Sequence, residues 1–492
     1  MSNTNNKNRW QALDSDLHRI SRLEHANVHV ARPLLAPGIA LAFIVIAGLI
    51  AAILFGRADG GLIVIAAAGF GAYMAINIGA NDVANNMGPA VGANALTMGG
   101  AIAIAAVAES AGALLAGGDV VSTISKGIID PASVQNSSVF IWAMMAALIS
   151  SALWVNLATW VGAPVSTTHS VVGGVMGAGV AAAGLSAVSW GTMSAIAASW
   201  VISPVLGGAI AAGFLALIKA KIQYQDDKIA AARRWVPILV AVMAGAFATY
   251  LSVKGLKRIV KIDLEIALVI GLTSGILAWA VTVPWVRRKS EGLENRTKSL
   301  KVLFGLPLVI SAGFLSFAHG ANDVANAVGP LAAIVHAAEF GDFASKVTIP
   351  TWVMVIGAFG ISFGLFLFGP KLIRMVGSQI TKLNPMRAFC VALSAAITVI
   401  VASWLGLPVS STHIAVGAVF GVGFYREWNQ DRRRKQSNDR RPPELRLARE
   451  EQRRRKLVRR SHFMTIIAAW VITVPAAAAM SAVIFWILTA FT

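Results

Sequence analysis

The chain has 492 residues, of which 56% are hydrophobic and 13% are charged, whereas an average soluble protein has about 25% charged residues. Its formal net charge is +19, and its single cysteine, Cys390, excludes an internal disulfide and a cysteine metal cluster. These values exclude an ordinary soluble domain and predict an all-α integral membrane protein with about twelve transmembrane helices.

The N-terminal region divides into a polar and an apolar part. Residues 1–32 are polar and include the acids Asp14, Asp16 and Glu24, which predicts a cytoplasmic tail and no signal or transit peptide. Residues 33–57 are apolar and long enough, at 1.5 Å per residue, to cross about 30 Å of hydrocarbon. They predict an extra transmembrane helix ahead of the first polar motif.

The first polar motif, GANDVAN at residues 79–85, interrupts an apolar stretch and is followed by Gly88 and Pro89. A carboxylate at membrane depth is costly unless it is paired or solvated, and nearby Gly and Pro predict a broken or re-entrant helix that lines a cavity. Asp82 and Asn85 are three residues apart, so they share a helix face. Their hard oxygen ligands suit Na⁺, and a protonatable aspartate could instead carry H⁺.

A further intramembrane acid, Glu109, lies in the next apolar stretch, at residues 101–116. Ionisable residues inside membranes commonly mark ion pathways, so Glu109 is a candidate for the cation path. The alternative is a buried carboxyl group that is hydrogen-bonded to a neighbouring helix.

The second polar motif, PVSTTH at residues 164–169, supplies the hydroxyls of Ser166, Thr167 and Thr168. Pro followed by Ser or Thr before a Gly-rich apolar run predicts a helix start. The free N–H groups and positive dipole of a helix N-terminus favour an oxyanion, although N-capping alone is an alternative explanation. His169 closes the motif and is a candidate for a proton-carrying or a structural role.

Both motifs occur twice, in the same order. GANDVAN returns at residues 320–326, 241 positions later, and PVSSTH returns at 408–413, 244 positions later; a looser pair is WVISP at 200–204 and WVITVP at 470–475. The predicted organisation is therefore a tail (1–32), an extra helix (33–57), transport repeat 1 (58–220), a linker with two transmembrane helices (221–301) and transport repeat 2 (302–492). Such repeats are often inverted and hold substrate between them near the midplane.

The second copies add candidate site residues, namely Asn322, Asp323, Asn326, Ser410, Ser411 and Thr412, with His413 in the same proton-carrying or structural role as His169. Aligning Gly364 with Gly112 places Ile361 opposite Glu109, so the acid occurs in one half only. His319 has no counterpart before Gly79, where Ile78 stands, and we interpret it as a local packing residue.

Basic residues concentrate at 219–234, 287–301 and in a loop at 426–462. The positive-inside rule predicts that these segments are cytoplasmic, near anionic lipid headgroups. A nucleic-acid partner is not expected, because nothing in the basic loop is built to read bases.

The paired GANDVAN and PVS[S/T]TH motifs resemble those of the inorganic phosphate transporter (PiT) family, and the resemblance covers both halves. It implies about twelve helices in an inverted repeat and uptake of phosphate with Na⁺ or H⁺, without a further cofactor. It also implies a multi-pass protein of the plasma (inner) membrane, with a homodimer as a candidate assembly. The extra N-terminal helix and the short linker depart from the family pattern, which leaves regulation and partner contacts open.

By this resemblance, the Asn and Asp residues of both GANDVAN motifs coordinate phosphate and cations, and the hydroxyls of the second motif complete the phosphate site. The family residues are Asn81, Asp82, Asn85, Asn322, Asp323 and Asn326, with Ser166, Thr167, Thr168, Ser410, Ser411 and Thr412. Na⁺ is expected at Asp82, Asn85, Asp323 and Asn326, and Glu109 near the cation path.

The sequence predicts a secondary symporter that works by alternating access, in which cations neutralise Asp82 and Asp323. The absence of a Walker A motif argues against direct drive by ATP. Three alternatives remain: a sulfate or other oxyanion permease of the same fold, a phosphate-ester enzyme using His169 and Asp82, and a channel. Duplication of one site motif argues against the enzyme.

Overall fold

The computed structural model describes residues 34–57, 60–130, 133–161, 165–255, 262–341, 347, 349–379, 383–439 and 460–490. The predicted N-terminal tail and residues 440–459 of the basic loop lie outside the described residues. Within the described part of the chain, eleven helices are long and apolar enough to cross a membrane. The prediction of an all-α membrane protein with about twelve spans is therefore confirmed.

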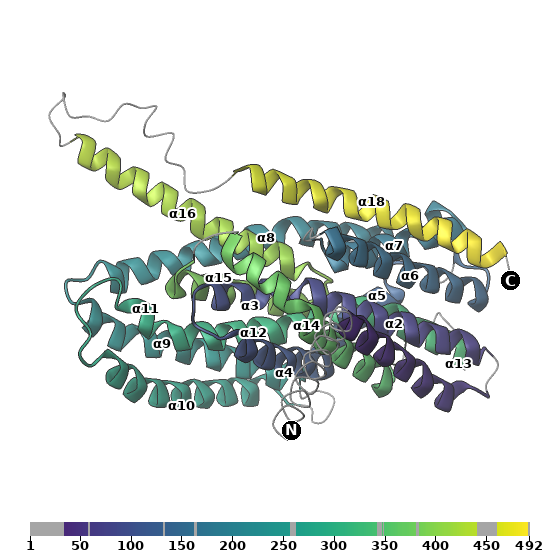
Figure 1. Ribbon diagram of the computed structural model, residues 1–492, viewed down its shortest axis with the longest axis horizontal. Coiled ribbons are helices and arrows are strands. Elements are labelled where there is room, and N and C mark those ends of the chain that lie inside the picture. Colours follow the sequence, from purple (N-terminus) through teal and green to yellow (C-terminus); the bar gives the residue numbers. More distant parts are fainter. Residues whose placement is uncertain are drawn as a thin grey trace, which may run out of the picture.

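The helices follow the order of the sequence repeat (Figure 1). The first described helix is Leu34–Phe55, where the extra span was expected. The first half contains α2 (Gly61–Asn81), α3 (Val83–Gly92), α4 (Met98–Ala116), α5 (Gly118–Lys126), α6 (Ser137–Val161), α7 (Thr167–Ala183) and α8 (Trp190–Ile218). The second half contains α12 (Gly305–Asp323), α13 (Ala325–Phe340), α14 (Thr351–Gln379), α15 (Pro385–Trp404), α16 (Ser411–Asp439) and α18 (Arg460–Ala490).

Two long helices and one short helix lie between the halves: α9 (Lys228–Tyr250), α10 (Leu264–Ser290) and α11 (Leu300–Leu303). Helices α9 and α10 pack against each other, and Figure 1 shows them as a pair along one edge of the molecule. The outer helix α10 exposes apolar side chains such as Leu272 and Val281, and it ends in the basic run 287–289. Exposed apolar side chains above a basic end are typical of a helix that faces lipid and ends in the cytoplasm.

Each GANDVAN motif interrupts its helix. Helix α2 ends at Asn81 and α3 begins at Val83, so the break falls at Asp82. In the second half, α12 ends at Asp323 and α13 begins at Ala325. The predicted break amounts to an irregularity of one residue in each half. Asp82 and Val324 keep right-handed helical backbone angles, and the N–H of Asp82 still donates a bond of 2.9 Å to the carbonyl of Ile78. One carboxylate of each half thus lies at a local irregularity of an otherwise nearly continuous helix.

The two halves exchange packing partners. Helix α2 of the first half packs against α14 of the second, and α12 of the second half packs against α4 of the first. Likewise α7 packs against α18, and α16 packs against α8. Each half thus buries its apolar surface on equivalent helices of the other half, so the two repeats form one intertwined body (Figure 1).

Glycines make these exchanged contacts close. A Cβ at Gly79 would lie 1.8 Å from the carbonyl oxygen of Ile361, and a Cβ at Gly320 would lie 2.1 Å from that of Glu109. Small residues let helix backbones approach closely in membranes. The first glycine of each motif therefore contacts the backbone of the other half: Gly79 contacts Ile361, and Gly320 contacts Glu109. Ile361 and Glu109 occupy equivalent positions in the two repeats.

We expect Gly79→Ala to destabilise the folded protein by about 1–3 kcal/mol, because the added methyl group has no space at the contact between α2 and α14. Thermal unfolding of the detergent-purified protein measures the change. Gly99→Ala is the matched control, because a Cβ at Gly99 meets no atom within 4 Å. Equal unfolding temperatures for the two variants would contradict the prediction.

Candidate functional site

The second motif of each half forms a capped helix N-terminus. The hydroxyl of Ser166 accepts a hydrogen bond of 3.1 Å from the backbone N–H of His169, at the start of α7. The hydroxyl of Ser410 accepts the equivalent bond of 3.3 Å from His413, at the start of α16. The predicted helix starts are confirmed, and each presents the N–H groups and positive dipole of a helix N-terminus inside the protein.

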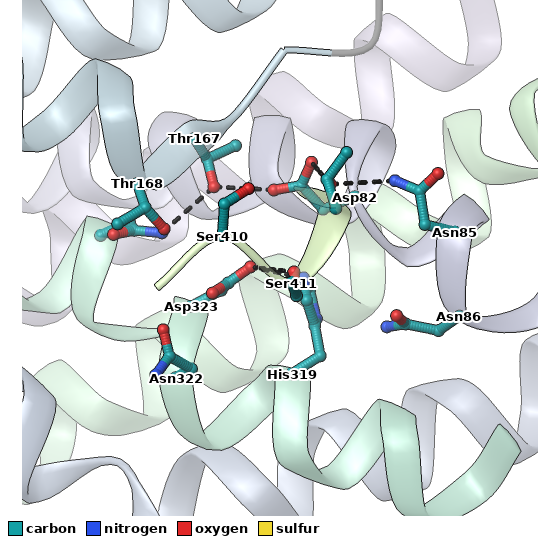
Figure 2. Close-up of polar contacts among 12 residues, drawn as sticks. Asp82, Asn85, Asn86, Thr167, Thr168, His319, Asn322, Asp323, Ser410 and Ser411 are labelled. Carbon is teal, nitrogen blue, oxygen red and sulfur yellow. Dashed lines mark hydrogen bonds and ion pairs between the residues drawn. The ribbon is translucent and has the colours of Figure 1, made fainter. Parts of the chain in front are cut away.

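The two motif carboxylates are buried among these helix starts (Figure 2). Asp82, which is 2% exposed, accepts hydrogen bonds from the hydroxyls of Thr167 at 2.7 Å and Thr412 at 3.1 Å. Asp323, which is 1% exposed, accepts a bond of 2.9 Å from the hydroxyl of Ser411. Thr167 and Ser411 occupy the same position of the repeated motif, so each carboxylate is bound by the first helical residue of its own half.

The two asparagines three residues further on connect the halves. The side-chain amide of Asn85 donates a bond of 3.0 Å to the hydroxyl of Thr412. The amide of Asn326 donates to the hydroxyls of Thr168 and Thr167, each at 3.1 Å. Thr412 and Thr168 are equivalent positions, so each asparagine reaches across to the other half. The cluster is therefore complete only when both halves contribute.

Three buried side-chain oxygens in this cluster remain available to bind a cation. They accept no hydrogen bond from the described residues, and they are Oδ1 of Asp323, Oδ1 of Asn326 and Oδ1 of Asn81. Ligand atoms of Asp82, His319 and Asp323 all lie within 4.8 Å of one another. Two neighbouring buried carboxylates repel each other unless a cation offsets their charge. Oxygen ligands of this kind fit a hard cation such as Na⁺.

The first asparagine of each motif lies at the edge of the cluster and differs between the halves. Asn81 donates a bond of 2.8 Å to the hydroxyl of Thr159. Asn322 donates to the hydroxyl of Ser403 at 2.9 Å and to a backbone carbonyl, and it accepts a bond of 3.2 Å from the N–H of Val409. Asn322 thus connects α12 to the segment before α16, whereas Oδ1 of Asn81 accepts no hydrogen bond from the residues that the structure describes.

His319 belongs to the polar cluster, although the sequence interpretation left it out. Its Nδ1 lies 2.5 Å from Oε2 of Glu109, and its Nε2 lies 2.8 Å from Oδ2 of Asp323. Glu109 also accepts a bond of 3.0 Å from the amide of Asn86. The interpretation of His319 as a packing residue is wrong, because its ring joins two fully buried carboxylates from opposite halves. The sequence signal was that one half has an unmatched acid and the other an unmatched histidine.

The two motif histidines lie behind the helix starts. The rings of His169 and His413 are 4.4 Å apart, and that of His169 is 3.9 Å from the ring of Trp200. The Trp200 indole donates a bond of 3.0 Å to the carbonyl of Pro408. Both imidazoles line an apolar groove between α8, α16 and α18. They contact each other across the halves and help to hold α7 and α16 together.

If the cluster performs the phosphate uptake that the motif resemblance implies, we expect Thr412→Val to lower it by about tenfold to a hundredfold. Valine keeps the shape but removes a donor to Asp82 and an acceptor for Asn85. An unpaired buried polar group costs about 1–3 kcal/mol. Uptake by proteoliposomes at a fixed protein amount measures the loss. Thr489→Val is the control, because the two hydrogen bonds of that hydroxyl to described residues both lie within α18. Unchanged uptake by Thr412→Val would show that the Thr412 hydroxyl is not part of the site.

Known proteins provide an independent comparison. The model of the phosphate transporter family matches residues 78–481. A Helicobacter pylori protein named "Putative phosphate permease" is 54% identical over 427 residues, which is 85% of this chain and 80% of that protein. "Inorganic phosphate transporter 2-1, chloroplastic" of Arabidopsis thaliana is 36% identical, over 85% of this chain and 71% of that protein.

A solved structure is similar over nearly the whole chain. It is titled "The sodium-dependent phosphate transporter", is 35% identical in sequence and superposes with a TM-score of 0.79. The match covers 88% of this chain and 100% of that one. The two proteins therefore share the overall arrangement of helices.

Proposed function

Because this chain belongs to the phosphate transporter family, we propose that it is a symporter that moves inorganic phosphate together with Na⁺ by alternating access. The observation that carries the proposal is the reciprocal cluster, in which each half supplies one carboxylate, one capped helix N-terminus and one asparagine that reaches across. The coupling ion is inferred from the oxygen ligands of this cluster, and the name of the sodium-dependent relative supports it.

Phosphate is proposed to bind between the N-termini of α7 and α16. Their N–H groups can donate hydrogen bonds to an oxyanion, and helix dipoles supply positive potential without a Lys or Arg in the motifs. The hydroxyls of Thr167, Ser411 and Thr412 donate to Asp82 and Asp323 in this structure, so they would turn from the carboxylates to the anion when it binds. Phosphate at neutral pH carries one or two protons, whereas sulfate carries none. The carboxylates of Asp82 and Asp323 can accept a hydrogen bond from a phosphate hydroxyl, so the cluster favours phosphate over sulfate.

Na⁺ is proposed to bind first or together with phosphate, at Asp82, Asn85, Asp323 and Asn326. Its charge would offset the repulsion between the two buried carboxylates and between them and the incoming anion. The bonds of Asn85 to Thr412 and of Asn326 to Thr168 join the halves. Movement of one half relative to the other must change these bonds, which couples loading of the site to its exposure on one side of the membrane.

H⁺ is a second candidate for the coupling ion. It is favoured by the buried contact of His319 with Glu109 and Asp323, since all three side chains can bind a proton. In this alternative, the coupling ion is a proton bound by His319, Glu109 and Asp323. It takes the place of a Na⁺ ion bound by oxygen ligands.

The test is uptake of radiolabelled phosphate by proteoliposomes that contain the purified chain. A Na⁺ gradient and a pH gradient are imposed separately, and unlabelled sulfate is added in excess. Uptake that follows the Na⁺ gradient and ignores sulfate is the expected result. Uptake that follows only the pH gradient would assign coupling to H⁺, and full competition by sulfate would change the substrate to oxyanions in general.

A further inference from the structure

A large apolar groove lies outside the site, between α8, α16 and α18. Its volume is about 1100 Å³, and its walls include Val205, Ala212, Phe420, Phe424 and Val474. The part of its lining on α8 runs from residue 197 to residue 212, about 22 Å at 1.5 Å per residue. That length suffices for a lipid tail in one leaflet, which is about 15 Å deep.

One end of the groove is aromatic and basic. Tyr425 and Trp428 line the groove, and both lie beneath cations. The ammonium of Lys219 is 5.0 Å from the centre of the Tyr425 ring, and the guanidinium of Arg432 is 5.6 Å from that of Trp428. Tyr and Trp beside Lys and Arg are typical of the membrane–water interface, so this end lies at headgroup level.

Further cations surround Lys219. Arg387, Arg426 and Arg433 each lie close enough to Lys219 to repel it electrostatically. Among the described residues, none of these four cations forms a salt bridge with a carboxylate. We call Lys219, Arg387, Arg426 and Arg433 the basic cluster. Four unneutralised cations at headgroup level attract an anionic group.

Charge decides among the possible occupants of the groove. The segment 440–459, which leaves the end of α16, contains nine basic and three acidic residues, so it would add positive charge to the cluster. A second copy related by a twofold axis along the membrane normal would place the same cluster at the same depth facing itself. Both occupants would increase the repulsion, and a zwitterionic lipid would leave it uncompensated.

We propose that the groove is a binding site for one anionic phospholipid. Its acyl chains lie along α8, α16 and α18, and its phosphate lies at the basic cluster, over Tyr425 and Trp428. Helix α16 packs along α8, and Figure 1 shows its far end projecting beyond the bundle, away from α18. This lipid is separate from the transported anion, because the groove lies behind His169 and His413.

Native mass spectrometry of the purified full-length protein tests the site. The protein is exchanged into detergent with equal amounts of phosphatidylglycerol and phosphatidylcholine, and the lipid retained per protein is measured. We expect one phosphatidylglycerol to be retained preferentially. Lys219→Gln/Arg433→Gln should weaken its retention by about thirtyfold, as expected for two basic residues next to an anionic headgroup. Ala209→Phe, which fills the groove wall, should remove both lipids.

Two matched controls separate the site from general effects. Arg296→Gln/Lys298→Gln removes two exposed cations from the loop between α10 and α11, and Ala195→Phe adds the same ring on an exposed part of α8 outside the groove lining. Both should retain phosphatidylglycerol as the unmodified protein does. Equal retention of the two lipids, or retention unaffected by Lys219→Gln/Arg433→Gln, would overturn the proposal. Loss of a dimer in Ala209→Phe with lipid retention intact would assign the groove to a second copy instead.

Discussion

Asp323→Asn is expected to abolish phosphate uptake while leaving the protein folded in the membrane. The asparagine keeps the size of the side chain and can still accept the hydrogen bond from Ser411, but it removes one of two charges in the buried cluster. A cation that loses one of two carboxylate ligands in a buried site is bound more weakly by several kcal/mol, and each 1.4 kcal/mol is about a tenfold change in affinity. Uptake should therefore fall below about 1% of the unmodified rate.

The measurement is initial uptake under a Na⁺ gradient, normalised to reconstituted protein, together with the Na⁺ dependence of any residual rate. Asp119→Asn is the matched control, because Asp119 is exposed at the end of α5 and pairs with Lys254 outside the cluster. Asp82→Asn should behave like Asp323→Asn, since both carboxylates occupy equivalent positions. Near-normal uptake by Asp323→Asn would remove the second motif copy from the transport site.

His319→Ile is expected to destabilise the protein by about 3–5 kcal/mol, which would make it the least stable of these variants. The substitution leaves Glu109 buried without its nearest charged partner, and it removes the contact of the ring with Asp323. Breaking a buried pair by removing one partner is costly because the remaining charge stays desolvated. Thermal unfolding in detergent measures the loss.

The repeat supplies a compensating change. The positions that correspond to His319 and Glu109 in the opposite halves are Ile78 and Ile361, and both isoleucines are fully buried. The chain therefore already has buried apolar residues at the equivalent positions of the other half. The double variant His319→Ile/Glu109→Ile should recover most of the stability lost in His319→Ile. If the double variant unfolds at the same temperature as the single one, the pair does not act as a unit.

The double variant also separates structure from transport. A purely structural pair would leave uptake near normal once stability is restored. If His319 and Glu109 carry the coupling proton, the stable double variant would lose dependence on the pH gradient. Retained Na⁺-driven uptake in that variant would support Na⁺ as the coupling ion.

The sequence alone determined the membrane class, the duplication and most of the residues that the structure gathers in the polar cluster. The length of an apolar segment indicates whether it can span a membrane, because the hydrocarbon core has a defined thickness. A carboxylate in an apolar stretch is energetically costly and commonly has a functional role. Asp82 and Asp323 could therefore be recognised as candidate site residues without a structure. The helix starts at Ser166 and Ser410 were also predictable, since capping depends on a few neighbouring residues.

Tertiary structure decided which of these residues meet. The bond between Asn85 and Thr412 joins positions 327 residues apart, and Glu109 and His319 are 210 residues apart. Helical periodicity shows which side chains share a face of one helix, but not which other helix that face contacts. The exchange of helices between the halves sets those contacts, through glycines such as Gly79 and Gly320 that admit a neighbouring backbone. For the same reason, only the packing of α8 with α16 brings Lys219 over Tyr425, at one end of an apolar groove.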